Sequence, residues 1–325
     1  MKILLIKGGR SLEHNISLKS AQTVRETLEN MGHEVTDLLL PPSGEIPLTL
    51  FQGDYDIAYP VMHGRLGEDG CIQGLLELIG KPYVSERVFT SSIGMNKLKQ
   101  HEILHYSDIP LVPTIGLKRG RGEDERMLLE DFTKHFNEFI VKINGGGSSI
   151  GVFSCDRDSL ENAVEEAFTY DDTVLVQKKI TPLRELECLV VKDRDGRILT
   201  AGPLEVIADK PYTDYSNKYS SAVTHIIEAK DNENLSHETV DTLHSLAARA
   251  FDALDGSLYM RIDFFMDGDG MIYLNEVNTI PGSTPTSHFN ILARELGGFG
   301  EVLNIMLESA LARHEKEKGL RRLYG

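Results

Sequence analysis

The sequence predicts a protein of the α/β and α+β classes, with an N-terminal doubly wound parallel layer followed by two mixed units. The first observation is a regular alternation of short apolar runs and helix-like stretches near the N-terminus, which is typical of a parallel sheet covered by helices. The second is a change in this pattern after Met95. The third is the segment 261–282, RIDFFMDGDGMIYLNEVNTIPG, in which polar and apolar residues alternate on either side of a glycine-containing turn.

The N-terminal layer is predicted from its apolar runs and the glycines that interrupt them. Its expected elements are, in order, a strand at Lys2–Ile6, a helix from about Ser17 to Met31, strands at His33–Leu40 and Asp56–Met62, and a helix at Cys71–Ile79. The loops GGRSLEHN and HGRLGEDG follow the first and third strands. Ligands of such sheets usually bind beyond the carboxyl ends of the strands, so both loops are candidate binding segments.

The middle and C-terminal units are predicted in the same way. The middle unit is expected to contain helices at 96–106, 125–135 and 158–169, strands at 139–143, 151–154 and 173–177, and a charged loop at 118–125. The C-terminal unit is expected to contain strands at 188–192, 198–205, 261–266 and 271–277 and helices at 236–254 and 299–314. There is no internal repeat.

Length and composition set broad limits on function. At 325 residues, with 41% hydrophobic and 26% charged residues, the chain can bury a substantial core and is globular rather than disordered. A net charge of −16 argues against general nucleic-acid binding, although it permits a nucleotide ligand. The three cysteines are far apart, so they indicate neither zinc nor a disulfide framework. No apolar run suits a signal peptide or a membrane span, so a cytoplasmic protein without membrane partners is expected.

The segment 261–282 predicts a β-hairpin that carries a metal site. A two-residue turn at Gly268-Asp269 would place Glu276 opposite Arg261 and Leu274 opposite Asp263. Period-two alternation then places four polar residues on one face: Arg261, Asp263, Glu276 and Asn278. Carboxylate and amide oxygens suit magnesium, and the adjacent arginine suits a phosphate or an oxyanion. The alternative is an ordinary hairpin with solvated charges, whereas a calcium loop is excluded by the later ligand spacing.

The run Asn144–Gly151, NGGGSSIG, is a candidate phosphate-binding loop between two expected strands. Glycines allow backbone N–H groups to approach phosphate oxygens, and Ser148 and Ser149 add hydroxyl donors. Lys97 and Lys142 could supply positive charge to phosphates. The alternative is a flexible hairpin loop with two surface lysines. No Walker A motif is present, so a P-loop enzyme is not predicted.

Three further segments carry weaker signals. The segment 177–187, QKKITPLRELE, crosses from the middle to the third unit, and a carboxylate there suits an adenine edge and a ribose. The polar and aromatic segment 214–219, DYSNKY, is either a mobile functional loop or an ordinary surface loop. His63, close to Glu68 in the chain, is either a substrate-orienting residue or a structural one.

Taken together, these motifs resemble the D-alanine–D-alanine ligase family of ATP-grasp enzymes along nearly the whole chain. The resemblance rests on GGRSLEHNISLKSA, HGRLGEDGCIQGLLELIGKPYV, MNK at 95–97, VKINGGGSSIGV, RELEC, DYSNKY, and RIDFF through NEVNTIPGST. It implies a three-domain ATP-grasp fold, with a first-substrate domain at 1–93, a central ATP-grasp subdomain at 94–180 and a C-terminal ATP-grasp and metal domain at 181–325. ATP would lie between the last two.

The resemblance also implies a role for individual residues in binding ATP and metal. The ATP-binding residues would be Lys97, Lys142, Gly147, Ser148, Ser149, Gln177, Lys178, Lys179, Ile180, Glu185 and Lys218. The loop 145–151 would close over the triphosphate. Asp263, Glu276 and Asn278 would be the ligands of magnesium, with two ions expected and Mn²⁺ as a substitute.

For the amino-acid substrates, the resemblance implies sites on both sides of the reaction centre. Glu13 would bind the ammonium of the first amino acid, with His63 nearby, and Ser287 the carboxylate of the second. Arg261 and the Gly282 N–H would steady the acyl phosphate and the tetrahedral intermediate. A loop network that closes the site would include Ser148, Lys218 and Tyr219, so that the implied catalytic set is Glu13, Ser148, Tyr219, Arg261 and Gly282.

The implied activity is the ADP-forming ligation of two D-alanines through an acyl phosphate, for peptidoglycan synthesis and hence cell shape, in a homodimeric enzyme. His288 departs from the family pattern, because an apolar residue usually lines the second subsite there. It leaves open a ligase of the same mechanism that makes another dipeptide. Ile143, Gln177 and the segment 224–229 also depart from the pattern. A non-catalytic nucleotide binder is a further alternative, and a dehydrogenase is disfavoured because GxGxxG is missing from the first loop.

Overall fold

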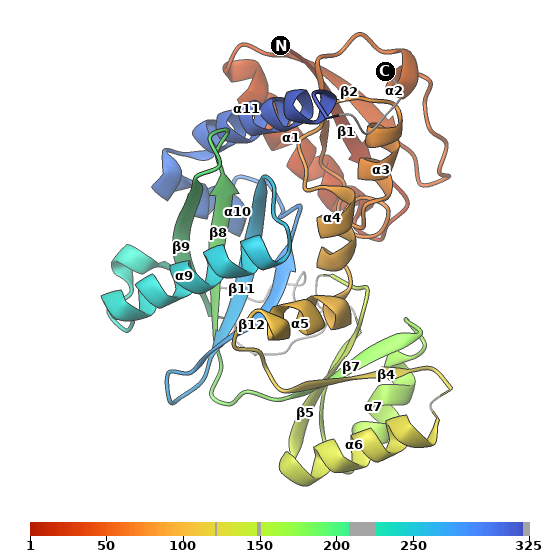
Figure 1. Cartoon of the computed structure of the whole chain (residues 1–325), viewed down its shortest axis with the longest axis vertical. Helices are drawn as coiled ribbons and strands as arrows, with labels where there is room; N and C mark the ends of the chain where they lie inside the picture. The colour runs from red at the N-terminus through yellow and green to blue at the C-terminus, as the bar shows by residue number, and fades with distance from the viewer. Residues whose placement is uncertain (121, 148–150, 208–224, 321–325) are drawn as a thin grey trace.

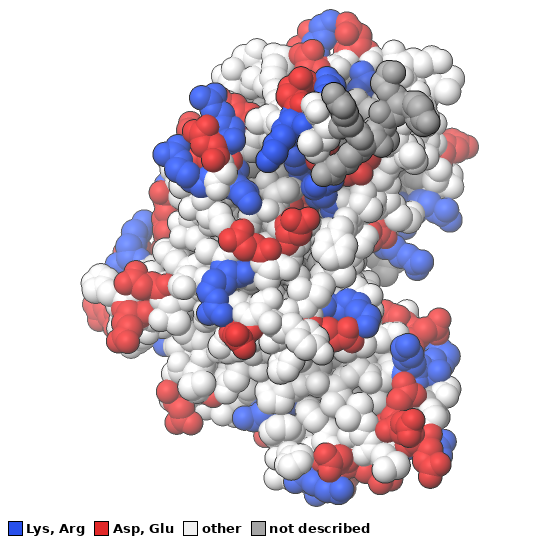
Figure 2. Space-filling view, in the orientation of Figure 1, with Lys and Arg blue, Asp and Glu red and all other residues white. Residues whose placement is uncertain are grey.

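The computed structural model describes residues 1–120, 122–147, 151–207 and 225–320, and its strands form three separate sheets. The N-terminal sheet lies at the top of the view in Figure 1, the C-terminal sheet in the middle and the central sheet at the bottom. Figure 2 shows Lys and Arg side chains interspersed with Asp and Glu over this face of the molecule. Within the described ranges, no helix combines the length and the apolar character that crossing a membrane requires.

The N-terminal sheet confirms the predicted parallel layer. Its strand order is β2 (Glu34–Leu40), β1 (Lys2–Gly8) and β3 (Ile57–Pro60), and both pairings are parallel. Side chains alternate on β1, so that Ile3 and Leu5 pack with α1 while Leu4 and Ile6 pack with α3 on the other face. The helices of this part are α1 (His14–Asn30), α2 (Thr49–Gln52), α3 (Cys71–Leu78) and α4 (Val88–Gly94).

The central sheet is antiparallel and carries two helices packed on it. Its strand order is β4 (Thr114–Lys118), β7 (Thr173–Lys178), β5 (Glu138–Ile143) and β6 (Val152–Asp156). The helices α6 (Glu123–His135) and α7 (Leu160–Ala167) pack against it through a separate apolar cluster. Strand β4 was not predicted, because a five-residue segment with an internal glycine gives little periodic signal. The helix α5 (Lys97–Tyr106) connects the N-terminal part to this sheet.

The C-terminal sheet has five antiparallel strands. Their order is β10 (His225–Glu228), β9 (Ile198–Ile207), β8 (Arg184–Lys192), β11 (Tyr259–Met266) and β12 (Ile272–Asn278). One face is covered by α9 (His237–Ala253), and the other by α10 (His288–Leu292) and α11 (Phe299–Lys318). Short 3₁₀ helices occur at Ala229–Asp231 and Ala293–Leu296.

Strand β8 shows how one face of this sheet is divided between core and site. Its even-numbered residues Cys188 and Val190 pack with α9. The odd-numbered Leu189 and Val191 join a cluster that includes α11 and the N-terminal sheet. Because successive side chains alternate, Glu187 lies on this second face, beyond the end of the apolar cluster. The same face is therefore hydrophobic at one end and polar at the other.

The β11–β12 hairpin corrects the predicted register. Strand pairing ends at Met266–Ile272, so that a five-residue loop replaces the two-residue turn, and Asp263 pairs with Glu276. Arg261 pairs with Asn278 rather than with Glu276. One extra residue, Asn275, stands on β12 between the paired positions 274 and 276 and forms a β-bulge. The longer loop shifts the pairing register by one residue and the bulge shifts it by one more, so the four predicted polar residues still share one face.

Candidate active site

Lys97 connects three segments at the centre of the molecule. It is the first residue of α5, and the Asn96 side chain caps this helix by accepting the Lys99 N–H at 3.0 Å. The Lys97 Nζ donates to the Gly146 carbonyl at 2.7 Å and lies 2.8 Å from Oε2 of Glu276. The start of α5, the glycine-rich loop and the β11–β12 hairpin therefore meet at one ammonium group.

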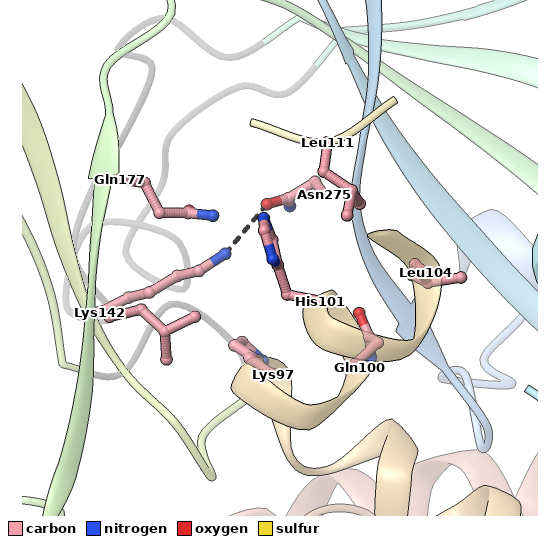
Figure 3. Close-up of a pocket in the computed structure, with 9 residues that line it drawn as sticks. Lys97, Gln100, His101, Leu104, Leu111, Lys142, Gln177 and Asn275 are labelled. Atoms are coloured by element: carbon pink, nitrogen blue, oxygen red, sulfur yellow. Dashed lines mark hydrogen bonds between the residues drawn. The ribbon is translucent and has the colours of Figure 1, made fainter. Parts of the chain in front are cut away.

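A small pocket lies beside Lys97, between α5, the central sheet and β12. Figure 3 shows the Lys142 side chain crossing from β5 toward Asn275, whose Oδ1 accepts a hydrogen bond from Nζ at 3.1 Å. The pKa of Lys142 is lowered to about 8, mainly by burial; the Glu276 carboxylate opposes this shift and the Lys97 ammonium adds to it. The pocket is lined by Lys97, Gln100, His101, Leu104, Leu111, Lys142, Leu175, Gln177 and Asn275.

Arg261 is held in a double contact with Asp263, which lies two residues further along β11. Its Nε donates to Oδ1 at 2.8 Å and its Nη2 to Oδ2 at 2.7 Å. The Arg261 Nε also lies 3.1 Å from Oε2 of Glu187, and the same oxygen lies 2.8 Å from Nδ1 of His288. Four side chains from β8, β11 and α10 therefore form one chain of charge-assisted contacts.

Burial dominates the electrostatics of this group. It is the main reason that the pKa of Asp263 is raised to about 6. The Glu187 and Glu276 carboxylates add to this effect, and the Arg261 guanidinium offsets it only in part. For Arg261, burial alone would lower the pKa, but the Asp263 and Glu187 carboxylates outweigh it and the pKa is raised. The arginine therefore stays charged.

The three expected metal ligands share the polar face of the hairpin. Asp263 and Glu276 are directly paired, and Asn278 is paired with Arg261. The Asn278 Oδ1 accepts the Ile280 N–H at 3.0 Å, which fixes the side chain in a turn. The set therefore consists of two carboxylates and one amide. Among the described residues, no group of three or more His, Cys, Asp or Glu could hold a metal. Oxygen donors of this kind fit Mg²⁺, and each carboxylate is balanced here by a protein cation.

Glu13 and His63 lie on the N-terminal side of the site. A side chain on Gly64 would collide with the Glu13 carboxylate, and a Cβ on Gly147 would lie 3.7 Å from its Oε2. Glu13 thus lies between two glycine-containing loops. His63 is only 4% exposed, and its Nδ1 lies 2.9 Å from the Ile280 carbonyl oxygen. Burial would lower the pKa of His63, but the Glu68 and Glu13 carboxylates and the Ile280 carbonyl together raise it.

The residues expected around the nucleotide base are spread over a wider area. Gln177 lines the pocket and donates from Nε2 to Thr114 Oγ1 at 2.8 Å. The Lys178 Nζ lies 5.8 Å from the centre of the Phe136 ring, and the Lys179 Nζ lies 3.1 Å from Glu138 Oε1. Both ammonium groups are therefore turned toward the α6–β5 side in this arrangement. Two more of these residues complete the set, the buried Ile180 and, on β8, Glu185.

Other expected site residues lie in the segment between β12 and α10 or outside the described ranges. The Ser287 Oγ caps α10 by accepting the Asn290 N–H at 3.3 Å. Gly282 has open space where a Cβ would stand. Ser148, Ser149, Lys218 and Tyr219 fall outside the described residues.

Sequence reasoning missed the role of Glu187 and Asn275. Glu187 is 8% exposed and joins Arg261 to His288, and Asn275 binds Lys142 from the bulge. The alternation of side chains along a strand could have placed Glu187 on the same face as Glu185, two residues earlier. The sequence around Glu187 does not indicate its partners. Asn275 could not have been found, because only the bulge brings it to Lys142.

Comparison with known proteins decides the family. Residues 103–308 match the family model described as "D-ala D-ala ligase C-terminus", and residues 48–86 match "D-ala D-ala ligase N-terminus". The chain belongs to the D-alanine–D-alanine ligase family. This agrees with the resemblance drawn from the motifs, and it confirms the predicted ATP-grasp fold class.

Members of the D-alanine–D-alanine ligase family match along almost the whole chain. The D-alanine–D-alanine ligase of Bacillus cytotoxicus is 32% identical and covers 98% of each chain. The structure of D-alanyl-alanine synthetase A from Vibrio cholerae has a TM-score of 0.84 and 31% identity, covering 96% of this chain and 98% of the other. The structure of the VanG D-Ala:D-Ser ligase from Enterococcus faecalis has a TM-score of 0.83 and 25% identity, covering 95% and 99%.

Proposed function

We propose that this protein is an ATP-dependent, ADP-forming ligase that joins two D-alanines through an acyl phosphate, for peptidoglycan precursor synthesis. The observation that carries the proposal is the polar face of the β11–β12 hairpin. There Arg261 and Asp263 form a two-bond pair, and Glu276, which is paired with Asp263, contacts Lys97 of α5. Family membership and relatives with this name at 32% identity support it.

The residues around Lys97 suit a nucleoside triphosphate and its cation. Lys97 and Lys142 would contact the phosphates, and the loop that includes Gly147 would cover them. Two Mg²⁺ ions, or Mn²⁺ in their place, would be held by Asp263, Glu276 and Asn278; bound there, such ions neutralise the triphosphate and polarise the transferred phosphoryl group. Base and ribose would lie against Gln177, Lys178, Lys179, Ile180 and Glu185.

The proposed reaction has two steps. The carboxylate of the first amino acid attacks the γ-phosphorus, a P–O bond to ADP breaks, and an acyl phosphate forms. The free amine of the second amino acid then adds to the acyl carbon, loses a proton, and phosphate leaves. Arg261 is suited to both steps, because its buried guanidinium stays charged and would stabilise the negative charge that develops on oxygen.

Each amino acid has a proposed subsite. Glu13 would bind the ammonium of the first, close to His63, and Ser287 would bind the carboxylate of the second. The Gly282 N–H would assist Arg261 at the developing oxyanion. Ser148, Ser149, Lys218 and Tyr219 are proposed, from the motif resemblance alone, to belong to the segments that exclude water during the reaction.

The proposal is tested by a product assay. The protein is incubated with ATP, Mg²⁺ and single or paired amino acids, and products are identified by mass. We expect D-alanyl-D-alanine and one ADP per dipeptide from D-alanine alone. The absence of a dipeptide from D-alanine, together with a dipeptide from another pair, would contradict the D-alanine assignment but keep the ligase.

A second candidate is a ligase of the same mechanism with a different second amino acid. The contact of His288 with Glu187 favours it, because an imidazole and a carboxylate make a polar wall where Ser287 would bind the second substrate. The similar VanG structure bears the name of a D-Ala:D-Ser ligase. Including D-serine in the pairwise assay separates the two candidates.

A homodimer in the cytoplasm is proposed for the assembly and location. A protein that forms a small-molecule precursor from ATP is expected where ATP is made. Light scattering of the purified protein at several concentrations tests the dimer, and a monomer throughout would contradict it.

The domain boundaries at 93/94 and 180/181 are likewise proposed, and limited proteolysis tests them.

A further inference from the structure

Two buried side chains of the N-terminal part hold the turn that follows β12. His63 Nδ1 lies 2.9 Å from the Ile280 carbonyl oxygen, and Ser20 Oγ accepts the Ser283 N–H at 3.1 Å. Ser20 Oγ also lies 3.0 Å from His63 Nε2. Ser20 is fully buried in α1, and His63 follows β3. Here Ser20 and His63 are called the clamp, and residues 280–283 the clamped turn.

The hydrogen atoms of the clamp can be assigned from chemistry. A carbonyl oxygen only accepts, so the His63 Nδ1 carries the hydrogen that it donates to Ile280. In the neutral imidazole, Nε2 then accepts from the Ser20 hydroxyl, and in the imidazolium Nε2 donates to the Ser20 oxygen. The Ser20 oxygen in turn accepts the Ser283 N–H. Each group in this chain therefore has a partner, which makes the clamp rigid rather than adaptable.

The clamped turn leaves one backbone N–H available. The Ile280 N–H donates to Asn278, Pro281 has no N–H, and the Ser283 N–H donates to Ser20. Among the residues that the structure describes, the Gly282 N–H has no hydrogen-bond partner, and the space beside its Cα is open. An unpaired donor next to open space is suited to binding an anion.

The direction of this N–H is fixed by Ser283. The Ser283 Oγ donates to the Pro281 carbonyl oxygen at 3.2 Å, and that carbonyl shares a peptide plane with the Gly282 N–H. In a planar trans peptide the C=O and N–H point in opposite directions. The Gly282 N–H therefore points away from the Ser283 hydroxyl. Since Ser20 holds Ser283, the clamp sets the direction of the free donor.

We propose that Ser20 and His63 are positioning residues that preorganise the Gly282 N–H for the oxyanion of the tetrahedral intermediate. The inference rests on the proposed ligase function. It gives the N-terminal part a role in the second step of the reaction, beyond binding the first amino acid. A donor that is fixed before the reaction stabilises developing charge without the energetic cost of reorienting at that moment.

The test compares two buried serines on the same helix. Ser20→Ala removes the hydroxyl that holds the clamped turn. Ser17→Ala is the matched control, because the Ser17 hydroxyl is also fully buried and has two partners, the Gly8 N–H at 2.8 Å and the Val61 carbonyl, both within the N-terminal part. The measured quantities are kcat, KM for each substrate, and the inhibition constant of a phosphinate dipeptide that mimics the tetrahedral intermediate.

In Ser20→Ala we expect kcat to fall at least about tenfold, less than the 10²–10³-fold that loss of a whole oxyanion donor costs. The inhibition constant of the phosphinate should rise by a similar factor, while KM for ATP stays within roughly twofold. A merely structural serine would not change the tetrahedral mimic selectively, so Ser17→Ala should leave the ratio of inhibition constant to KM unchanged. Ser20→Thr, which keeps the hydroxyl, should restore most of the loss.

Three results would overturn the inference. In the first, Ser20→Ala and Ser17→Ala behave alike. In the second, the phosphinate binds Ser20→Ala as tightly as it binds the unmodified protein. If Ser20→Ala does not fold, Ser283→Ala takes its place, because it removes only the bond to Pro281. The third overturning result is then normal affinity of Ser283→Ala for the phosphinate. An unmodified protein that forms no dipeptide would instead refute the proposed function, and the inference with it.

Discussion

The Nζ of Lys97 lies 2.8 Å from Oε2 of Glu276, and this contact joins the start of α5 to strand β12. The lysine side chain is 13% exposed and the glutamate 30%, so the pair is largely shielded from water. In the proposed function the lysine contacts phosphate and the glutamate binds metal. The ion pair thus holds the two groups together, in an arrangement that ATP and Mg²⁺ would replace with new contacts.

Glu276→Gln should weaken the use of magnesium. We expect the half-saturating Mg²⁺ concentration to rise at least about tenfold, since loss of a ligand should cost no less than the roughly 10–100-fold that follows loss of a residue hydrogen-bonded to a ligand. Magnesium titration of turnover at saturating ATP measures this. Glu102→Gln is the control, because Glu102 forms an exposed ion pair at 2.6 Å with Lys99, and both residues lie on α5. Equal Mg²⁺ requirements in the two variants would remove Glu276 from the metal site.

Arg261→Ala should separate ATP binding from turnover. We expect ATP affinity to stay largely intact while turnover falls at least about 10²-fold, because the cation acts on charge that develops during the reaction. The turnover of Arg261→Lys should lie between those of the unmodified protein and Arg261→Ala. Its ammonium keeps the charge but cannot form the two-bond contact with Asp263. Calorimetry of ATP binding and steady-state kinetics provide the measurements. Unchanged turnover in Arg261→Ala would exclude Arg261 from the mechanism.

Lys142 should make ATP use sensitive to alkaline pH. Its pKa is lowered to about 8, so the ammonium is present below this pH and lost as the pH rises through it. We therefore expect kcat/KM for ATP to fall above about pH 8, approaching tenfold per pH unit. In Lys142→Arg the guanidinium stays charged, so the fall should disappear or shift to higher pH. A profile of the unmodified protein that is flat to about pH 9.5 would contradict this assignment.

His288→Leu should change the preference for the second amino acid. The variant removes the imidazole that contacts Glu187 at 2.8 Å and makes the wall of the proposed subsite apolar. We expect the ratio of kcat/KM for D-alanine to that for D-serine to rise about tenfold. Competition between the two amino acids, with mass detection of the dipeptides, measures the ratio. An identical ratio before and after the change would show that His288 does not face the second substrate.

Glu86→Ala should destabilise the protein, because Glu86 connects the N-terminal and C-terminal parts. Its fully buried carboxylate accepts from the Ser257 N–H and hydroxyl at 2.7 Å and from the Leu258 and Tyr259 N–H groups at 2.8 Å. Removing it leaves buried donors unpaired, and we expect the free energy of unfolding to fall by at least about 3 kcal/mol. Urea unfolding measures this.

The control for Glu86 is Glu77→Ala. Glu77 is an exposed acid that accepts one hydrogen bond, from the Tyr83 hydroxyl at 2.7 Å. Its loss should lower the free energy of unfolding by less than about 1 kcal/mol. Similar losses in the two variants would mean that Glu86 does not stabilise the contact between the two parts.

Most of the elements could be predicted from sequence, because periodicity is a local property. The strands β1 and β5 and the helix α9 were placed within a few residues, since their apolar spacing reflects the face that each one buries. The short strands β4 and β10 were missed. Segments of four or five residues contain too few periods, and only pairing with a longer neighbour makes them strands.

Within the candidate site, the residue types that share the hairpin face could be predicted from local alternation. Alternation on β11 places Arg261 and Asp263 together whatever the rest of the chain does, and the motif order identified the family. It could not determine the partners on β12. The register depends on the loop length and on the bulge at Asn275, and these are set by packing against β8 and α9.

Tertiary structure alone decided the contacts that cross long stretches of chain. Glu187 meets His288 over 101 residues, and Ser20 meets Ser283 over 263. No local pattern encodes such a pair, because nothing within the segment of either side chain indicates a distant partner. Only the packing of the N-terminal and C-terminal sheets into one hydrophobic core brings Ser20 to the turn after β12 and aligns the polar ends of both parts.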